Sequence, residues 1–488
     1  MIATAESARA LADAVRSGRA SARATTETAR DRLRAAHTTT GALADLDDSG
    51  ALEAAESVDA AVARGEDPGP LAGVPVVLKD NLCQRGRPCT CGSRLLEGYR
   101  APYDAHVVSR LRAAGAVLLG RAHMDEFAMG SSTETCAWGP VRNPWDPSRV
   151  PGGSSGGSAA LVAAGAVPVA LGSDTGGSLR LPAAFCGLVG LNPTWGRVSR
   201  RGLVAFASST DRIGPLVREV RDCARVAGVL AGPDPLDATC ADRPVPDWEA
   251  ACEQGVRGLS IGVPRAWLGD AETAVTDALE QALSALAAAG ATVRDVPLPA
   301  PDLALAAYYV LAPAEASANL ARFDGIRYGH RETDGDLEGL YTTTRGRGFG
   351  PEVRRRVLIG TWVLSAGYGE ALYAQARRAR EAVARGLGEA LEQVDVLLTP
   401  PAPTRAFPLG TRRDPLAMYN TDRCTVPASL AGLPALAVPW GLADGLPVGV
   451  QVMARAFDEA SCFRVAAAIE AAAAPLSPPR LWTAPGTA

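Results

Sequence analysis

Apolar and polar residues follow one another along this chain in blocks that predict alternating strands and helices. The runs VPVVLKDN at 74–81 and AVLLGRAHM at 116–124 are short and mostly apolar, as buried strands are. Between them, HVVSRLRAAG at 106–115 places its apolar residues at helical spacing and ends at a glycine. A helix followed by a strand is predicted again over 156–172. This repeated order predicts an α/β fold built in layers.

The remaining segments divide into a helical start, a second strand–helix part and a long helical stretch. Residues 5–35 predict two amphipathic helices, the second with Ser21 as its N-cap. The stretch 231–249 is rich in turn residues and predicts a connector. A long helical stretch is predicted over about 302–393. Further strands are predicted at 259–264, 394–400, 435–441 and 447–454, and further helices at 271–290 and 459–474.

The bulk composition is that of a globular protein and argues against several function classes. Of 488 residues, 47% are apolar and 21% are charged, and the net charge is −4. This net charge argues against a nucleic-acid-binding surface, apart from a local patch such as Arg354–Arg356. The N-terminus lacks the pattern of a signal peptide, and the longest apolar run, 159–172, is too short to cross a membrane. We therefore expect a cytoplasmic protein that does not associate with membranes.

The ten cysteines and four histidines do not have the spacing of a metal site. Cys89 and Cys91 are close in sequence, but no second pair of ligands accompanies them at zinc spacing. The histidines are scattered as well. We expect no metal on this chain, and cysteines buried as small apolar residues in a reducing compartment.

Lys79 is the only lysine of the chain, although lysine and arginine together number 49. Arginine can replace lysine wherever only a solvated positive charge is needed, because it stays protonated in proteins. It cannot replace a lysine that must release its proton, and burial can lower a lysine pKa from about 10.4 toward neutrality. A single lysine retained at the end of a buried strand is therefore a candidate general base.

Two segments rich in glycine and serine carry the other candidate groups. They are PGGSSGGSAALVAAG at 151–165 and LGSDTGGSLRLPAAF at 171–185. Flexible linkers share this composition, but apolar runs enclose both segments. Phosphate-binding loops share it too, but no glycine here is followed by lysine, as the Walker A pattern requires. A histidine-based hydrolase fits poorly, since Pro151 stands where a strand should precede the serine and only His330 follows.

A serine nucleophile with lysine as its base fits these segments better. Gly176 and Gly177 come directly before Ser178 and would let the backbone turn tightly. Their N–H groups, with that of Thr175, could then point at a developing oxyanion. Lys79 would be the base that activates the hydroxyl.

The motifs LKDN at 78–81, GGSSGGSAA at 152–160 and GSDTGGSLRLPAAFCGLVGLNPT at 172–194 together resemble the amidase signature family. The resemblance implies that Ser178 is the nucleophile, that Ser154, held by a cis peptide bond, bridges to it, and that Lys79 is the base. It also implies an α/β/α sandwich around a large mixed β-sheet. The domains would then be an N-terminal helical segment, 1–65, and an amidase signature domain, 66–488.

Over nearly its whole length the chain is similar to the A subunits of the amidotransferases for Glu-tRNA(Gln) and Asp-tRNA(Asn). Segments of the C-terminal half such as GFGPEVRRRVLIGTWVLSAGY at 348–368 carry this resemblance. It implies a pocket for free glutamine, with Arg355 on the α-carboxylate, Asp422 on the α-ammonium and Tyr309 lining the wall. Arg356 is the alternative to Arg355. A zwitterion needs one fixed cation and one fixed anion, and a guanidinium suits a carboxylate.

The same resemblance implies a role within a complex. Ser178 would release ammonia from glutamine for partner subunits B and C, which amidate charged tRNA with ATP and Mg²⁺. The chain has no ATP motif, so we expect no cofactor on it and contact with tRNA only through the complex.

Four residues depart from the pattern of these A subunits: Leu181 replaces glutamine, Asn192 replaces lysine, and Trp195 and Arg201 replace tyrosine. An apolar residue at position 181 is usual in stand-alone amidases. These departures leave open an alternative, a stand-alone or pathway-specific amidase that hydrolyses another carboxamide.

Overall fold

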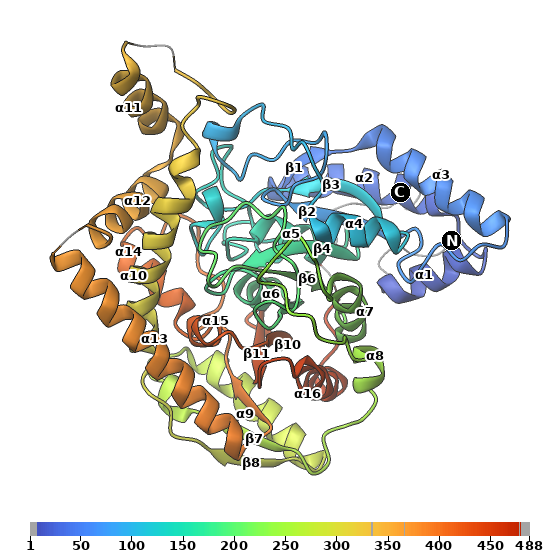
Figure 1. Cartoon of the computed structure of the whole chain (residues 1–488). Coiled ribbons are helices and arrows are strands. Elements are labelled where there is room, and N and C mark those ends of the chain that lie inside the picture. The colour runs from blue at the N-terminus through green and yellow to red at the C-terminus, as the bar shows by residue number, and fades with distance from the viewer. Residues whose placement is uncertain (1–6, 333–334, 366, 478, 480–488) are drawn as a thin grey trace.

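The computed structural model of the chain describes residues 7–332, 335–365, 367–477 and 479 (Figure 1). Positions 1–6 of the predicted N-terminal segment, and positions 333, 334 and 366 of the predicted helical stretch, lie outside the described residues. None of the described helices is long and apolar enough to cross a membrane.

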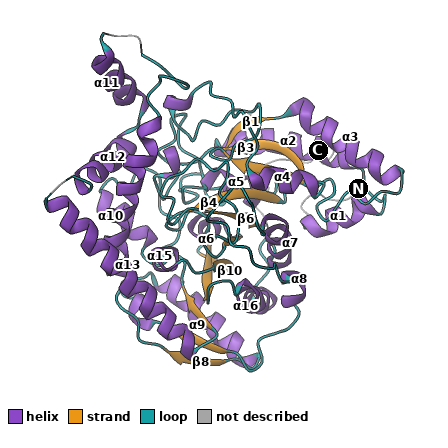
Figure 2. Ribbon diagram, in the orientation of Figure 1, coloured by secondary structure: helices purple, strands orange, loops and turns teal. Residues whose placement is uncertain are grey.

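A mixed eleven-stranded sheet runs through the described part of the chain (Figure 2). Its order is β1-β3-β2-β4-β6-β5-β10-β11-β9-β7-β8, so strands distant in sequence lie side by side. The parallel pairs include β2 with β3 and β2 with β4, whereas β4 with β6 and β10 with β11 are antiparallel. The strands are β1 Leu43–Leu46, β2 Pro75–Lys79, β3 Val117–Ala122, β4 Val169–Asp174, β5 Val189–Asn192, β6 Arg212–Val217, β7 Ser260–Val263, β8 Thr292–Asp295, β9 Val396–Thr399, β10 Ala435–Ala443 and β11 Leu446–Ala454.

Helices lie on both faces of this sheet and complete the α/β/α layers that the family resemblance implies (Figure 1). Helices α6 and α16 both pack on β10 and β11, and α5 packs on β2 and β4. The helices are α1 Ala8–Arg16, α2 Ala22–Thr40, α3 Asp48–Ala63, α4 His106–Ala113, α5 Gly156–Ala163, α6 Arg180–Cys186, α7 Val220–Leu230, α8 Trp248–Ala251, α9 Thr273–Ala288, α10 Pro301–Asn319, α11 Leu337–Gly348, α12 Pro351–Val363, α13 Tyr368–Gln393, α14 Pro415–Tyr419, α15 Val426–Ala431 and α16 Glu459–Ala472.

The predicted strands and helices are confirmed, with some additions. Within its described residues the predicted N-terminal segment holds α1, α2 and α3, and β1, between α2 and α3, pairs with β3 at the edge of the sheet. The sequence patterns did not predict β6, which lies in the middle of the sheet between β4 and β5. Gly214 and Pro215 interrupt its apolar pattern, and proline is unusual in a central strand because it cannot donate to a neighbour.

Helices α10 to α13 form the predicted helical stretch and gather on one side of the molecule (Figure 1). Helix α12 packs closely on α10 at Gly360, where a Cβ atom would lie 1.9 Å from the carbonyl oxygen of Pro313. This close contact fixes α12, which carries three consecutive arginines, against the rest of the structure.

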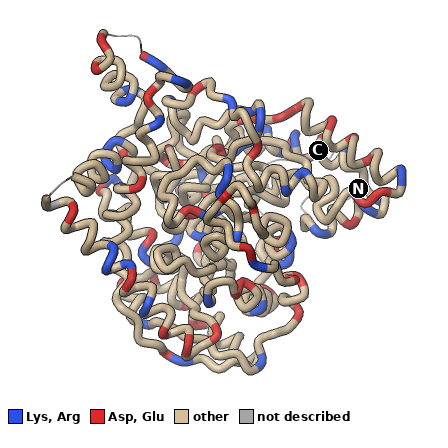
Figure 3. The backbone as a smooth tube through the Cα atoms, viewed as in Figure 1, with Lys and Arg blue, Asp and Glu red and all other residues tan. Residues whose placement is uncertain are grey.

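Acidic and basic residues are interspersed along the backbone (Figure 3).

Candidate active site

Lys79 is the last residue of β2 and is completely buried. Its Nζ donates hydrogen bonds to Ser154 Oγ at 2.8 Å, to Ser155 Oγ at 2.8 Å and to Ser173 Oγ at 3.0 Å. The parallel pairing of β2 with β4 brings Lys79 beside Ser173, near the end of β4. The structure therefore joins the only lysine of the chain to both glycine- and serine-rich segments.

Burial lowers the pKa of the Lys79 amine from 10.5 to about 7, because a charged amine is unfavourable away from water. The negative charges of Asp125, Asp174 and Asp211 partly oppose this change. Near neutral pH a large part of the Lys79 population is then uncharged, and a neutral amine is a competent base.

Ser154 lies two residues before the start of α5, and the peptide bond between Gly153 and Ser154 is cis, as the resemblance implies. Glycine is required at 153, since a Cβ atom there would lie 2.1 Å from Asp125 Oδ2 and 2.5 Å from the Ser132 nitrogen. The N–H of Asp125 donates to the Ser154 carbonyl at 3.2 Å. The serine is thus held by the loop that follows β3.

Ser178 lies in the loop between β4 and α6, and its carbonyl accepts the N–H of Ser155 at 3.2 Å. It is 7% exposed, whereas Lys79 and Ser154 are fully enclosed, so Ser178 is the outermost of the three. Among the hydrogen bonds of the described residues, none joins the Ser154 hydroxyl to the Ser178 hydroxyl. The structure shows the contact between lysine and Ser154 and places Ser178 next to it.

The loop before Ser178 offers four consecutive N–H groups, those of residues 175–178. No acceptor within the described part of the chain uses any of them. Gly176 and Gly177 let neighbours approach, because a Cβ atom would lie 2.8 Å from the Tyr308 ring and 2.2 Å from Thr425 Oγ1 respectively. Four unused donors in a buried loop are suited to stabilise an oxyanion.

Arg180 and Asp174, which the sequence patterns did not single out, form a buried ion pair next to this loop. Both side chains are fully buried, and two nitrogens of Arg180 donate to the two oxygens of Asp174 at 3.0 Å. Asp174 also accepts the N–H of Leu179 at 3.1 Å. Asp174 before Ser178 is thus joined to Leu179 and Arg180 after it, which holds the loop at both ends.

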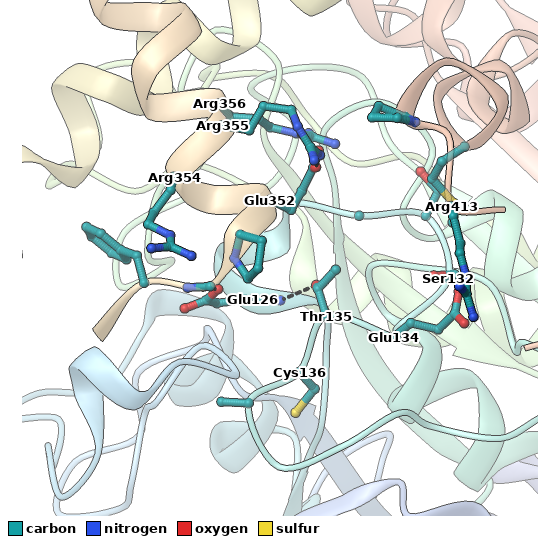
Figure 4. Close-up of a pocket in the computed structure, with 18 of the residues that line it drawn as sticks. Glu126, Ser132, Glu134, Thr135, Cys136, Glu352, Arg354, Arg355, Arg356 and Arg413 are labelled. Atoms are coloured by element: carbon teal, nitrogen blue, oxygen red, sulfur yellow. Dashed lines mark hydrogen bonds and ion pairs between the residues drawn. The ribbon is translucent and has the colours of Figure 1, made fainter. Parts of the chain in front are cut away.

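A cavity of about 650 Å³ lies next to the loop that holds Ser154, and Lys79, Ser154 and Ser178 are not among the residues that line it (Figure 4). Its lining includes Ser131 and Ser132, and Ser132 is the neighbour of Gly153 described above. Ten of its lining residues have charged side chains: Arg94, Glu126, Glu134, Arg347, Glu352, Arg354, Arg355, Arg356, Arg412 and Arg413. Such a cavity is suited to a small ligand that carries charge.

The structure brings together Tyr309 and Asp422, two of the predicted substrate-binding residues. Asp422 Oδ2 accepts the Ser131 hydroxyl at 2.6 Å and the Tyr309 hydroxyl at 3.3 Å. Burial raises the pKa of Asp422 to about 6, against the opposing effects of the Ser131 hydrogen bond and the positive charge of Arg356. At neutral pH the carboxylate remains mostly ionised and is available to a cation.

Arg355 and Arg356 both line the cavity but have different surroundings. Both form an ion pair with Glu352 (Figure 4). The Arg356 Nε donates to Glu352 Oε1 at 2.8 Å. The Arg356 side chain is 3% exposed and its guanidinium lies 5.2 Å from the centre of the Tyr309 ring, whereas the Arg355 side chain is 43% exposed. Arg355 therefore presents the more accessible cation, and Arg356 lies deeper beside Tyr309.

Glu352, Ser131 and Glu126 are site residues that the sequence patterns did not identify. Glu352 also accepts the Tyr419 hydroxyl at 2.8 Å, so one carboxylate holds both arginines and an aromatic wall. Helical spacing could have suggested it, because Glu352 stands three and four residues before the arginines. No group of three or more His, Cys, Asp or Glu side chains in the described ranges is arranged to hold a metal ion.

A family model described as Amidase matches residues 24–463. This chain belongs to the amidase family. Among amidase-family relatives, it is 56% identical to the A subunit of glutamyl-tRNA(Gln) amidotransferase from Moorella thermoacetica, over 86% of this chain and 87% of the relative. It is 52% identical to the corresponding protein of Synechococcus sp., over 95% and 96% of the two chains.

Solved amidase-family structures agree with this assignment. The crystal structure of the A subunit of glutamyl-tRNA(Gln) amidotransferase from Thermotoga maritima is 44% identical, with a TM-score of 0.76 over 91% of this chain and 90% of that one. Native peptide amidase from Stenotrophomonas maltophilia is 33% identical, with a TM-score of 0.83 over 98% and 99%. The resemblance carried by the sequence motifs is thereby confirmed at the level of the family and the fold.

Proposed function

We propose that this chain is the glutamine-hydrolysing A subunit of a tRNA-dependent amidotransferase. The observation that supports its chemistry most directly is the buried contact of 2.8 Å between Lys79 and Ser154 in an amidase-family fold. The identity of 52–56% to curated A subunits supports the choice of this amidase over a stand-alone one.

In the proposed reaction, neutral Lys79 withdraws a proton from Ser154, which in turn accepts the proton of Ser178. The Ser178 oxygen then attacks the side-chain carbonyl carbon of glutamine. The N–H groups of residues 175–178 stabilise the oxyanion that forms. The relay returns a proton to the leaving nitrogen, so that ammonia departs and an acyl-enzyme remains. Water then attacks this ester and releases glutamate.

The substrate pocket proposed for glutamine uses groups from three segments. Arg355 binds the α-carboxylate, and Asp422 binds the α-ammonium with Tyr309 beside it. Arg356 is the second candidate for the carboxylate, since it lies beside the same tyrosine. This arrangement selects a free amino acid rather than a simple amide, because each charged end has a partner of opposite sign.

The partners in this proposal are subunits B and C, which receive the ammonia. They carry the ATP, the Mg²⁺ and the contacts with charged tRNA, and this chain holds no cofactor of its own. The relatives described above are each named as the A subunit of an amidotransferase, and this naming supports the existence of partner subunits.

Glutamine hydrolysis by the purified chain, alone and with candidate partner subunits and charged tRNA, tests the proposal. We expect glutaminase activity that increases when the partners are added. We expect Lys79→Arg to lose on the order of 10³-fold in kcat, because the guanidinium cannot give up its proton. Robust hydrolysis of simple amides with little preference for glutamine would favour the stand-alone amidase instead.

A further inference from the structure

Glu126 connects two parts of the cavity wall that are far apart in sequence. Its Oε2 accepts the N–H of Gly350 at 2.8 Å, and its Oε1 accepts the Ser93 hydroxyl. Gly350 is the N-cap of α12, the helix that carries the three arginines. The residue is 2% exposed and lines the cavity. A buried carboxylate therefore holds the beginning of the arginine helix (Figure 4).

The neighbouring residue, Asp125, contacts Ser154 through its backbone and the segment 133–135 through its carboxylate. Its two oxygens accept the N–H of Thr133 at 2.8 Å and the hydroxyl of Thr135 at 2.9 Å. Its own N–H donates to the Ser154 carbonyl, and the N–H of Glu126 donates to Thr135 Oγ1 at 3.0 Å. Two consecutive residues thus connect Ser154 on one side with α12 on the other.

The local chain is shaped for the contact between Glu126 and α12. A Cβ atom at Gly350 would lie 2.3 Å from Glu126 Oε2. Gly350 has an ordinary φ of −69°, so the absence of a side chain here makes room for the carboxylate and is not required by the backbone. Directly after Glu126, Phe127 and Ala128 adopt φ values of 48° and 61°, which residues with a Cβ seldom do. Such conformations persist where the surroundings impose them.

We propose that Glu126 is a positioning residue that sets the place of the α12 arginines relative to the serines, and so sets the affinity for the α-carboxylate of glutamine. This inference rests on the proposed function, because it takes glutamine as the ligand of the cavity. Glu126 acts through α12 and takes no part in acylation. Its loss should therefore raise KM while leaving kcat nearly unchanged.

Glu126→Gln is the direct test, assayed in whichever form of the enzyme, alone or in complex, hydrolyses glutamine. The amide keeps the shape of the side chain but loses one of the two acceptors. We expect KM for glutamine to rise about tenfold and kcat to change less than twofold.

Glu470→Gln is the matched control. Glu470 is a partly buried glutamate that also accepts an N–H at the start of a helix, from Val220 of α7 at 2.7 Å, and burial raises the pKa of both glutamates to about 7. It lines a different cavity. We expect Glu470→Gln to shift the melting temperature as Glu126→Gln does, but to leave KM within twofold of wild type.

Gly350→Ala tests the contact itself. The added methyl group collides with the Glu126 carboxylate, so KM should rise in the otherwise wild-type chain. In the Glu126→Ala background the collision is gone, and Gly350→Ala should then change KM no further. Independent, additive effects of the two substitutions would overturn the inference.

The remaining outcomes separate the inference from the proposed function. An active wild-type glutaminase whose KM is unaffected by Glu126→Gln, or equally raised by Glu470→Gln, would overturn the positioning role alone. A loss confined to kcat would do the same, since it would place Glu126 in the chemistry. A wild-type enzyme that does not hydrolyse glutamine in any form would overturn the proposed function.

Discussion

Two regions of the candidate site are built in different ways. They are the centre, formed by Lys79, Ser154 and Ser178, and the arginine wall, formed by Arg355 and Arg356 with Tyr309 and Asp422. Lys79, Ser154 and Ser178 come from strand ends and loops within one stretch of 100 residues, 79–178, and all are buried. The arginine wall combines α10, α12 and the segment around Asp422, and part of it faces an open cavity. The first region depends on the sheet, and the second on helices packed beside it.

This difference separates the chemical step from the choice of substrate. A centre whose groups are fixed by the sheet can be common to many amidases, whereas arginines on a helix beside the sheet can change without disturbing the sheet. Substitutions in the centre should therefore reduce kcat, and substitutions in the wall should raise KM.

The largest effect is expected for Ser178→Ala, which removes the proposed nucleophile. We expect kcat for glutamine hydrolysis to fall by about 10⁴-fold while glutamine still binds, since the arginine wall is untouched. Isothermal titration with the variant checks the binding. Residual turnover above about one per cent of wild type would contradict the assignment.

A smaller effect is expected in the wall, where Arg355 and Arg356 should behave differently. Arg355→Ala should raise KM about 30-fold with little change in melting temperature, because its side chain is partly exposed. Arg356→Ala should instead lower the stability by about 3 kcal/mol, since it leaves the Glu352 carboxylate without its buried partner. Steady-state kinetics and thermal unfolding of both variants check this. The opposite pattern would make Arg356 the ligand of the carboxylate.

The pH dependence should report the buried amine of the centre. With the pKa of Lys79 at about 7, kcat/KM should be constant above that value and fall tenfold per pH unit below it, as the amine becomes protonated. Below about 6 the fall should steepen, because Asp422 then also becomes protonated and loses its charge. A profile of kcat/KM at constant ionic strength measures both. A flat profile down to pH 5 would rule out a neutral lysine as the base.

The smallest effect is expected for Tyr309→Phe. The Tyr309 hydroxyl donates to Asp422 at 3.3 Å, a long contact, while Ser131 supplies a shorter one at 2.6 Å. Removal of the weaker donor should raise KM about threefold and leave kcat unchanged. Ser131→Ala is the comparison, and we expect it to raise KM more. An equal or larger effect of Tyr309→Phe would mean that the tyrosine hydroxyl contacts the substrate itself.

The sequence predicted the centre more fully than the wall, for a physical reason. Buried strands such as β2 and β4 are short apolar runs, and Lys79 stands at the end of one of them. The grouping of Lys79 with Ser154 and Ser178 came from the family resemblance of the motifs that carry them. The sequence patterns did not predict the contacts of Ser155 and Ser173 with Lys79, because nothing in the sequence distinguishes these two serines from the others nearby.

The wall depends on residues that only the fold brings together. Ser131 contacts Asp422 across almost 300 positions, and no spacing in the sequence could reveal such a pair. The order of the strands was equally hidden, since β6 with Pro215 lies between β4 and β5. Local patterns predict elements, whereas pairings between distant elements follow from the packing of the whole chain.

The absence of a side chain at Gly176 lets α10 lie against the loop that carries Ser178. The ring of Tyr308 rests against the backbone of Gly176, and the next residue along α10 is Tyr309. Two consecutive residues of α10 therefore reach both regions: Tyr308 lies against the turn that precedes Ser178, and the Tyr309 hydroxyl donates to Asp422. The proposed pocket for the amino acid and the proposed nucleophile are thus linked through a single turn of one helix.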